Sequence, residues 1–265
     1  GQLAIDDPDA GDDGFAAPDP AEMEGTYGTF SLDLTNEWWE YSFDSAAMQY
    51  LRAGQSVSDS ATFFSRDGSD SITVTVTILG VDDDATITGS DYGSVTEDGP
   101  ISASGDLDND DPDAGQGGFQ TPASLAGVYG SFTFNATSGA WTYTLDNAAA
   151  QELVTGESVV ESLTVVSADG SASTTIEVTV RGADDGAAIT GDDAGSVAED
   201  GVLFASGDLD ATDPDDGEDV IHETGRTEQY GTWTFNAATG AWRYDLDNAY
   251  VQYLDADDVV TDTLS

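Results

Sequence analysis

The stretch YGSFTFNATSGAWTYTLDN, residues 129–147, decides how this chain folds. Aromatic and aliphatic residues alternate with polar ones on both sides of a short glycine-containing loop. Alternation with a period of two predicts a pair of β-strands, each with one buried face, joined as a hairpin. We therefore expect the rings of Phe132, Trp141 and Tyr143 to pack across one face as part of a core.

The same stretch occurs three times in the chain. YGTF at residues 27–30 precedes YGSF at 129–132 by 102 residues, and YGTW at 230–233 follows it by 101. Trp39, Trp141 and Trp242 keep this spacing. Tandem repetition is typical of spacers, stalks and binding arrays, whereas a catalytic site is rarely needed three times in a row.

The middle copy contains a second predicted hairpin. In residues 173–180, Ile176, Val178 and Val180 alternate with polar residues and should face the core, as should the corresponding residues of the first copy (Ile72, Val74, Val76 and Ile78). About seven short strands in ~100 residues predict an all-β fold, a Greek-key sandwich of immunoglobulin or cadherin type. Three aspartates should cap short helical turns after the hairpin: Asp44, Asp146 and Asp247.

The repeat divides the chain into a linear array of tandem modules. We expect an N-terminally incomplete first repeat at 1–80, a complete second repeat at 81–182, and a C-terminally incomplete third repeat at 183–265. The joints GVDDD and GADDG are short, so neighbouring modules should nearly touch. Either the chain is a window from a longer array, which we favour, or neighbouring chains supply the missing strands and form a filament.

Composition excludes several classes of function. The chain has 53 acidic residues, five arginines and no lysine, for a net charge of −48. Such a surface cannot neutralise phosphates, which excludes a nucleic-acid partner. No apolar run approaches the ~20 residues of a membrane span. Because there is no cysteine, a protein working outside the cell would need another reinforcement, for which a metal ion is suited.

Three acidic clusters recur in register and are the candidate metal ligands. They are the joints (Asp82, Asp83, Asp84 and Asp184, Asp185), the Glu-Asp-Gly turns (Glu97 and Glu199), and the Asp-Pro-Asp loops (Asp7, Asp9; Asp111, Asp113; Asp213, Asp215). In a sandwich, the joint and the Asp-Pro-Asp loop can share one pole, so carboxylates from separate loops would converge. The Glu-Asp-Gly turns could lie at either pole.

Ca²⁺ is the ion that these clusters favour. It takes six to eight oxygens at ~2.4 Å and tolerates irregular geometry, whereas Zn²⁺ prefers nitrogen and sulfur. Two other interpretations remain open: the clusters are polar turns, or they form the solvated acidic surface of a halophile's protein. The residues of an EF-hand loop and of a calcium β-roll are not in place.

The chain resembles the VCBS repeat of very large bacterial surface proteins. The resemblance rests on VTEDG (95–99), DPDAG (111–115), YGSFTF (129–134), WTYTLDN (141–147) and SADG (167–170), and it covers essentially the whole chain. It implies a cadherin-like or immunoglobulin-like extender of secreted RTX-type adhesins, often stiffened by calcium and involved in cell attachment and biofilm. In many such repeats the joint reads GTNDA, which leaves the ligands of these two joints open.

We therefore expect a non-catalytic structural extender of a bacterial surface adhesin or extracellular fibre. Its partners would be the neighbouring repeats and, in a fibre, other copies of itself. His222 lies in a variable loop and has no catalytic partners in sequence, which indicates a surface residue. A second hypothesis is a carbohydrate-binding module in which Trp38, Trp141 or Trp242 forms the platform, and burial of all three rings would exclude it.

Overall fold

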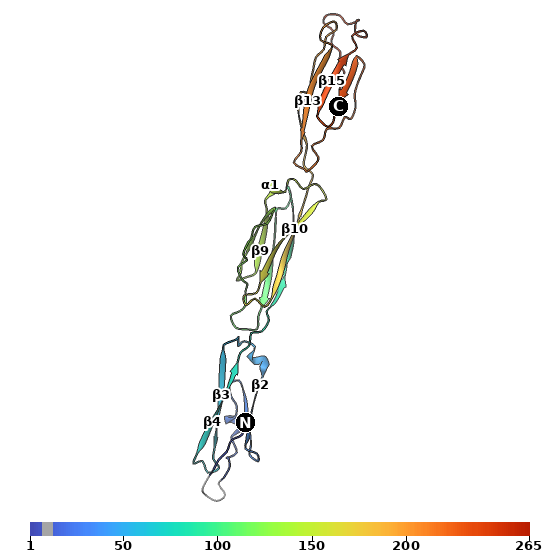
Figure 1. Cartoon of the computed structure of the whole chain (residues 1–265). Helices are drawn as coiled ribbons and strands as arrows, with labels where there is room; N and C mark the ends of the chain where they lie inside the picture. The colour runs from blue at the N-terminus through green and yellow to red at the C-terminus, as the bar shows by residue number, and fades with distance from the viewer. Residues whose placement is uncertain (7–12) are drawn as a thin grey trace.

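The computed structural model describes residues 1–6 and 13–265. Its strands form three modules that follow one another end to end, so that the molecule is long and narrow (Figure 1). Module 1 holds β1–β4, module 2 holds β5–β11 and module 3 holds β12–β15. We call the junction of modules 1 and 2 the first joint, and that of modules 2 and 3 the second joint.

Module 1 consists of two β-hairpins. Its elements are η1 (Pro20–Glu22), β1 (Gly28–Asp33), β2 (Trp38–Phe43), η2 (Ser45–Met48), β3 (Ser56–Phe64) and β4 (Ser71–Leu79). β1 pairs with β2, and β3 pairs with β4, both antiparallel.

Module 2 is a sandwich of seven strands. They are β5 (Thr86–Gly89), β6 (Tyr92–Thr96), β7 (Ser102–Asp110), β8 (Gly130–Phe134), β9 (Ala140–Leu145), β10 (Ser158–Val166) and β11 (Ser173–Arg181), with the short helix α1 (Asn147–Ala150) after β9. One sheet has the order β5-β7-β9-β8 and the other has the order β10-β11-β6. β6 changes sheets and runs parallel to β11. The predicted tandem all-β sandwich is thereby confirmed.

The core of module 2 lies between its two sheets, as the alternation predicts. Trp141 and Tyr143 of β9 are 2% and 0% exposed. From the facing sheet, Ile176 and Val178 are fully buried, and Val95 of β6 packs into the same cluster. The aromatic residues of the repeated hairpin are therefore core residues in this module.

The prediction for the second hairpin is only partly right in module 1. Ile78 is buried, but Ile72 is 44% exposed, and Val74 and Val76 are half-buried. For Val76 the difference lies in the neighbouring strand: in module 2, β6 pairs with β11 from Glu177 to Arg181, which includes the corresponding Val178, whereas β4 pairs only with β3 among the described residues. Thr174, the counterpart of Ile72, lies beyond this pairing.

Module 3 contains one four-stranded sheet with the order β12-β13-β15-β14. Its strands are β12 (Ala188–Gly191), β13 (Phe204–Thr212), β14 (Gly231–Phe235) and β15 (Ala241–Leu246). Trp242 and Tyr244 are buried on β15.

Two of the three predicted capping aspartates cap short helices. Asp44 precedes η2, and its carboxylate accepts a hydrogen bond from the N–H of Ala46 at 3.0 Å. Asp146 does the same for Ala148 before α1. In module 3, Asp247 accepts from Ala249, although the segment that follows is a turn rather than a helix.

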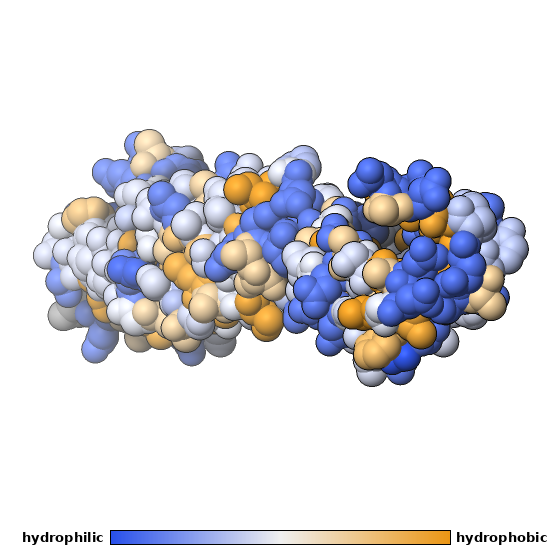
Figure 2. Space-filling view, turned by 90° about the horizontal axis from the view of Figure 1, so that it is seen from above, coloured by the Kyte–Doolittle hydropathy of each residue, from blue (hydrophilic) through white to orange (hydrophobic). Residues whose placement is uncertain are grey.

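The surface is strongly polar. In the view from above, hydrophobic residues form separate spots between hydrophilic ones (Figure 2). Among the described residues, none of the helices has the length and apolar character that crossing a membrane requires.

Candidate metal sites at the joints

In the first joint, the Asp-Pro-Asp loop folds back on the segment between the modules. Asp111 Oδ1 accepts a hydrogen bond from the N–H of Asp113 at 2.8 Å, which closes a tight turn. Asp113 is 1% exposed, and its Oδ2 accepts from the N–H of Asp83 at 2.7 Å. The turn thus directs the second aspartate of the loop into the joint.

The second joint repeats this arrangement 102 residues further on. The N–H of Asp215 donates to Asp213 Oδ1 at 3.0 Å, and the N–H of Asp185 donates to Asp215 Oδ2 at 2.7 Å. Asp215 is again 1% exposed. The joint and the Asp-Pro-Asp loop therefore share one pole of the module, as the sandwich topology predicts.

Glu97 reaches the second joint from module 2. It directly follows β6, which runs parallel to β11, so both strands end at the same pole. The N–H of Glu97 donates to the carbonyl of Arg181 at 3.1 Å. Its side chain is 1% exposed, and neither carboxylate oxygen has a hydrogen-bond partner.

Glu97, Asp185 and Asp215 bring carboxylates of two modules together. One oxygen of each lies within 4.8 Å of the others. Two oxygens that each lie ~2.4 Å from one Ca²⁺ are at most ~4.8 Å apart, so this spacing fits a single shared ion. Burying a carboxylate without a partner is costly, and a cation offsets that cost. The residues present therefore fit a calcium ion.

The electrostatics of the second joint favour a cation. Burial raises the pKa of Glu97, as do the charges of Asp185 and Asp215, whereas the nearby backbone N–H of Ala183 lowers it. Loss of contact with water raises the pKa of Asp185, and the charges of Asp98 and Asp215 raise it further. Like charges that raise one another's pKa bind a divalent cation favourably because the cation removes their repulsion.

A hydrogen-bonded pair holds the Glu-Asp-Gly turn in place. The N–H of Asp98 donates to Asn147 Oδ1 at 2.8 Å, and Asn147 Nδ2 donates to Asp98 Oδ1 at 2.6 Å. Asp98 has a φ of 50°, a left-handed conformation that is uncommon outside glycine. Asp200 and Asn248 form the same pair in module 3. The pair anchors the turn that carries Glu97.

In the first joint, hydrogen bonds hold Asp82, whereas in the second joint three carboxylates cluster together. Asp82 Oδ1 accepts from the N–H of Ala53 at 2.8 Å and from Gln116 Nε2 at 3.2 Å. Asp111 Oδ2 and Asp113 Oδ1 are buried without partners. Burial raises the pKa of Asp111, and the charges of Asp169, Asp113 and Asp82 add to the effect.

Two three-carboxylate groups are found among residues 1–6 and 13–265: Glu97, Asp185 and Asp215, and Asp184, Asp215 and Glu218. The other predicted ligands of the joints and of the Asp-Pro-Asp loops belong to neither group: Asp82, Asp83, Asp84, Asp111, Asp113 and Asp213. Glu199 occupies the Glu-Asp-Gly turn of module 3 and is likewise outside both groups, and its Oε2 is buried without a partner. Asp7 and Asp9 lie outside the described residues.

Sequence reasoning missed two acidic residues of the second joint. Asp98 follows Glu97 directly, and its charge raises the pKa of Asp185. Glu218 forms a second three-carboxylate group with Asp184 and Asp215. An alignment of the repeats could have pointed to Glu218, because it occupies the position at which the second copy has Gln116.

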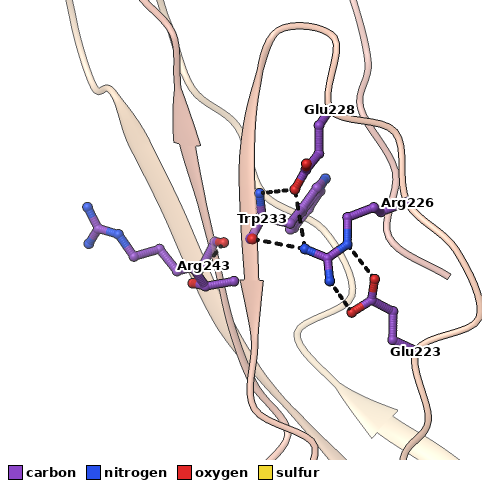
Figure 3. A network of polar contacts seen from close by, with 6 residues as sticks. Glu223, Arg226, Glu228, Trp233 and Arg243 are labelled. Carbon is purple, nitrogen blue, oxygen red and sulfur yellow. Dashed lines mark hydrogen bonds and ion pairs between the residues drawn. The ribbon is translucent and has the colours of Figure 1, made fainter.

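The residues peculiar to one copy form no catalytic arrangement within the described part of the chain. Arg226 pairs with Glu223 and Glu228 and donates to the carbonyl of Trp233 at 3.2 Å, so it fastens a loop to β14 (Figure 3). His222, four residues earlier, is exposed, as expected of a surface residue.

The tryptophans considered as a carbohydrate platform differ in exposure. Trp141 and Trp242 are 2% and 5% exposed, so the hypothesis is wrong for these two rings: each packs in the core of its module. The Nε1 of each donates to a backbone carbonyl inside the module. Trp38 is 51% exposed, so the carbohydrate hypothesis remains open for this ring.

The chain is similar in fold to several solved chains of tandem extracellular domains. Protocadherin Gamma B2 extracellular cadherin domains 1–5 match with 19% identity over 92% of this chain and 49% of that chain, at a TM-score of 0.43. PcdhgB3 EC1-4 matches with 16% identity over 88% of this chain and 57% of that one, at 0.40. Mouse Protocadherin-24 EC1-3 matches with 18% identity over 91% and 79%, at 0.34. The chain thus spans about half the length of the first two.

No curated protein matches the chain. Residues 82–182 match the family model of the bacterial cadherin-like domain. These residues include all seven strands of module 2 and end at the second joint. The chain therefore contains a cadherin-like module of the bacterial type, which indicates an extracellular, adhesion-type structural domain.

Proposed function

We propose that this chain is a run of extender modules of a bacterial cell-surface adhesin or extracellular fibre, with calcium stiffening its joints. The modules comprise residues 1–80, 81–182 and 183–265. They act in cell attachment and biofilm by setting the distance between an anchor and a binding domain. Their partners are the neighbouring modules, and they carry no catalytic chemistry.

The observation that carries the proposal is the state of Glu97. A fully buried carboxylate without a hydrogen-bond partner, pressed against two aspartates of the next module, destabilises the joint unless a cation is present. With Ca²⁺ bound, Glu97 of module 2 and Asp185 and Asp215 of module 3 share one ion. Binding then removes the repulsion and fixes the angle between the modules.

The resemblance to VCBS repeats and the match to the bacterial cadherin-like domain support the bacterial surface as the place of action. The repeated joint geometry supports a linear array, because both joints connect their Asp-Pro-Asp loop to the intermodule segment through a 2.7 Å hydrogen bond.

The test combines thermal melting with small-angle X-ray scattering of the full chain in calcium, magnesium, EDTA and sodium chloride. Micromolar to millimolar calcium should raise the melting temperature and narrow the distribution of shapes. Glu97→Gln should remove much of this response. Glu199→Gln is the matched control, because Glu199 occupies the same turn in module 3 but belongs to no carboxylate group among the described residues.

Two results would contradict the proposal. Equal recovery by sodium chloride and by calcium would identify the acidic surface as an adaptation to high salt. An unchanged calcium response in Glu97→Gln would show that the ion does not bind between the modules.

A second candidate function rests on Trp38. Its exposed ring borders a hollow of about 420 Å³ together with Ser31, Asp33, Asn36 and Glu40. An exposed ring beside hydrogen-bonding groups suits a sugar, whose C–H face stacks while its hydroxyls bond. Trp38→Ala restores the residue that copies two and three carry at this position. Affinity electrophoresis in polysaccharide gels should then show lost retardation, and equal mobility of both proteins in every gel would exclude this function.

A further inference from the structure

Three tyrosine rings come together in module 3. Tyr230 lies directly before β14, and Tyr250 and Tyr253 lie in the turn that follows β15. The ring centroids of Tyr230 and Tyr250 are 6.4 Å apart, and so are those of Tyr250 and Tyr253. The rings of this second pair meet edge to face, at 90°. We call the three residues the tyrosine cluster.

Two rings of the tyrosine cluster are exposed to solvent. Tyr250 and Tyr253 are 53% and 60% exposed, at the end of module 3 that is remote from module 2 (Figure 1). At the first joint, Tyr50 occupies the position of Tyr253 in the repeat. It is 40% exposed, although its carbonyl accepts a hydrogen bond from the N–H of Ala114 in module 2 at 3.1 Å. A ring at this position therefore stays accessible even where another module follows.

The complete cluster is peculiar to the third copy. The position of Tyr250 is alanine in the other two copies, and that of Tyr253 is Glu152 in the second. In module 2, the hydroxyl of Tyr129, the counterpart of Tyr230, donates to Glu152 Oε1 at 2.9 Å. Module 3 thus has a ring in place of this carboxylate, and a further ring in place of alanine. Because the chain turns at this place in all three modules, folding does not require the additional rings.

The surroundings of the tyrosine cluster are negatively charged. The N–H of Asp247 donates to the carbonyl of Tyr230 at 2.8 Å, and its carboxylate accepts from the N–H of Tyr250 at 3.3 Å. Partial loss of contact with water raises the pKa of Tyr253, and so do the neighbouring Tyr230 and the charge of Asp258. In a chain with a net charge of −48, such a site attracts cations. The negative faces of the rings favour a cation as well.

We propose that the tyrosine cluster binds a quaternary ammonium group, the trimethylammonium group of choline being the simplest example. The methyl groups of such a cation contact ring faces and need no hydrogen bond. A guanidinium or a primary ammonium carries several N–H donors that require acceptors once water is lost. Asp247 Oδ1 already accepts from the N–H groups of Ala249 and Tyr250, so this carboxylate oxygen contributes charge. The site goes beyond the role of the modules as extenders and shares no residue with the joints.

The test is a titration of the full chain with choline chloride at constant ionic strength, followed by nuclear magnetic resonance of isotope-labelled tyrosine rings. A parallel titration uses neohexyl alcohol, in which carbon replaces the nitrogen of choline, so that shape is kept and charge is lost. Choline should shift the signals of the cluster saturably and bind about fivefold more tightly than the neutral alcohol.

Three variants locate the site. Tyr250→Ala gives module 3 the residue of the other copies and should weaken choline binding about fivefold. Tyr253→Leu keeps an apolar side chain without a ring face, so it should weaken binding of choline and leave that of neohexyl alcohol unchanged. Tyr92→Ala removes an equally exposed ring on β6 and should leave both affinities at the wild-type value. Far-ultraviolet circular dichroism checks the fold of each variant.

The source of the cation is decided by sedimentation with phosphatidylcholine vesicles. Retention of the wild-type chain but not of Tyr250→Ala would show that the group is taken from a lipid surface, and choline binding without retention would show that the free cation is taken. Three results would overturn the site: no saturable shift with choline, equal affinities for choline and neohexyl alcohol, or wild-type choline affinity in both Tyr250→Ala and Tyr253→Leu.

Discussion

Tyr41 donates its hydroxyl hydrogen bond to the buried carboxylate of Asp59 at 2.7 Å. Asp59 also accepts from the N–H groups of Thr26, Tyr27 and Gly28, at 2.9, 2.8 and 3.1 Å. One carboxylate thus fastens the loop before β1 to β3 and to β2. We call this arrangement the carboxylate clamp.

The clamp recurs in the other modules, with one difference. In module 3, Asp262 accepts from the hydroxyl of Tyr244 at 2.8 Å and from the N–H of Tyr230 at 2.9 Å. In module 2 the acid is Glu161, which accepts from the N–H of Val128 at 2.8 Å. Its tyrosine, Tyr143, is fully buried, and its hydroxyl has no partner among the described residues.

Asp59→Asn should destabilise module 1 by about 1–3 kcal/mol, because an amide cannot accept all the hydrogen bonds that the carboxylate accepts. Urea unfolding followed by tryptophan fluorescence measures this. Glu40→Gln, on the exposed face of β2, is the charge-matched control. An Asp59→Asn midpoint equal to that of the control would contradict the prediction.

The contribution of the clamp should depend on pH. Burial alone would raise the pKa of Asp59, but hydrogen bonds from Tyr27, Tyr41 and the neighbouring N–H groups outweigh it and lower the pKa from its ordinary value of 3.8. Stabilisation by a group with a lowered pKa is present above its unfolded value and is lost as the pH falls through the folded value. The difference in unfolding free energy between wild type and Asp59→Asn should be constant from about pH 7 to 5 and shrink below about pH 4. A difference that grows on acidification would refute this.

The tyrosine hydroxyls of modules 1 and 2 should contribute differently to the free energy of unfolding. Tyr41→Phe removes a hydrogen bond to a charged group and should cost about 1.5–3 kcal/mol. Tyr143→Phe removes a buried hydroxyl without a partner among the described residues and should change stability by less than about 0.5 kcal/mol or increase it. Parallel denaturation of the two variants decides the matter, and an equal loss in both would show that Tyr143 has a partner in solution.

Gly130 should not tolerate a side chain. A Cβ atom there would lie 2.3 Å from the carbonyl oxygen of Thr144 and 2.6 Å from the Tyr143 hydroxyl. Gly130→Ala should therefore destabilise module 2 by about 1–3 kcal/mol through overpacking. Gly225→Ala, where the added atom meets nothing within 4 Å, is the control. Equal melting of both variants would mean that the strands can move apart without cost.

Asn147→Ala should weaken calcium binding, although Asn147 is not one of the proposed calcium ligands. The pair with Asp98 fixes the turn that carries Glu97, and loss of such outer support costs about tenfold in metal affinity. Asn248→Ala removes the same pair in module 3 and should leave calcium affinity unchanged. Calorimetric titration of the two variants compares them directly. Equal affinities would place the support of Glu97 elsewhere.

Features that depend on neighbours along the chain were predictable from the sequence. Alternation alone indicated the buried faces of β9 and β11, and the position of Asp146 just before a run of alanines indicated a helix cap. Each of these features is specified within a few residues. Val76 is less buried than its alternating pattern predicts, because burial at this position also requires a strand beside β4, as β6 provides for β11.

The positions of the joint residues required the topology. Glu97 and Asp185 are 88 residues apart, and only the change of sheet by β6 brings the Glu-Asp-Gly turn to the pole where β11 ends. From the sequence alone, the turn could be placed at either pole. The clamp acids are equally non-local, since Asp59 meets Tyr27 across 32 residues.

The parallel pairing of β6 with β11 determines how module 2 bears load. Both strands run toward the second joint. In sequence, β6 lies near the start of the module and β11 at its end, and the two pair from Tyr92 opposite Glu177 to Thr96 opposite Arg181. A pull on the two ends of the module draws these strands past each other lengthwise. The ladder is then loaded in shear, with its hydrogen bonds strained together rather than unzipped one after another, which is the arrangement that suits a tether under tension.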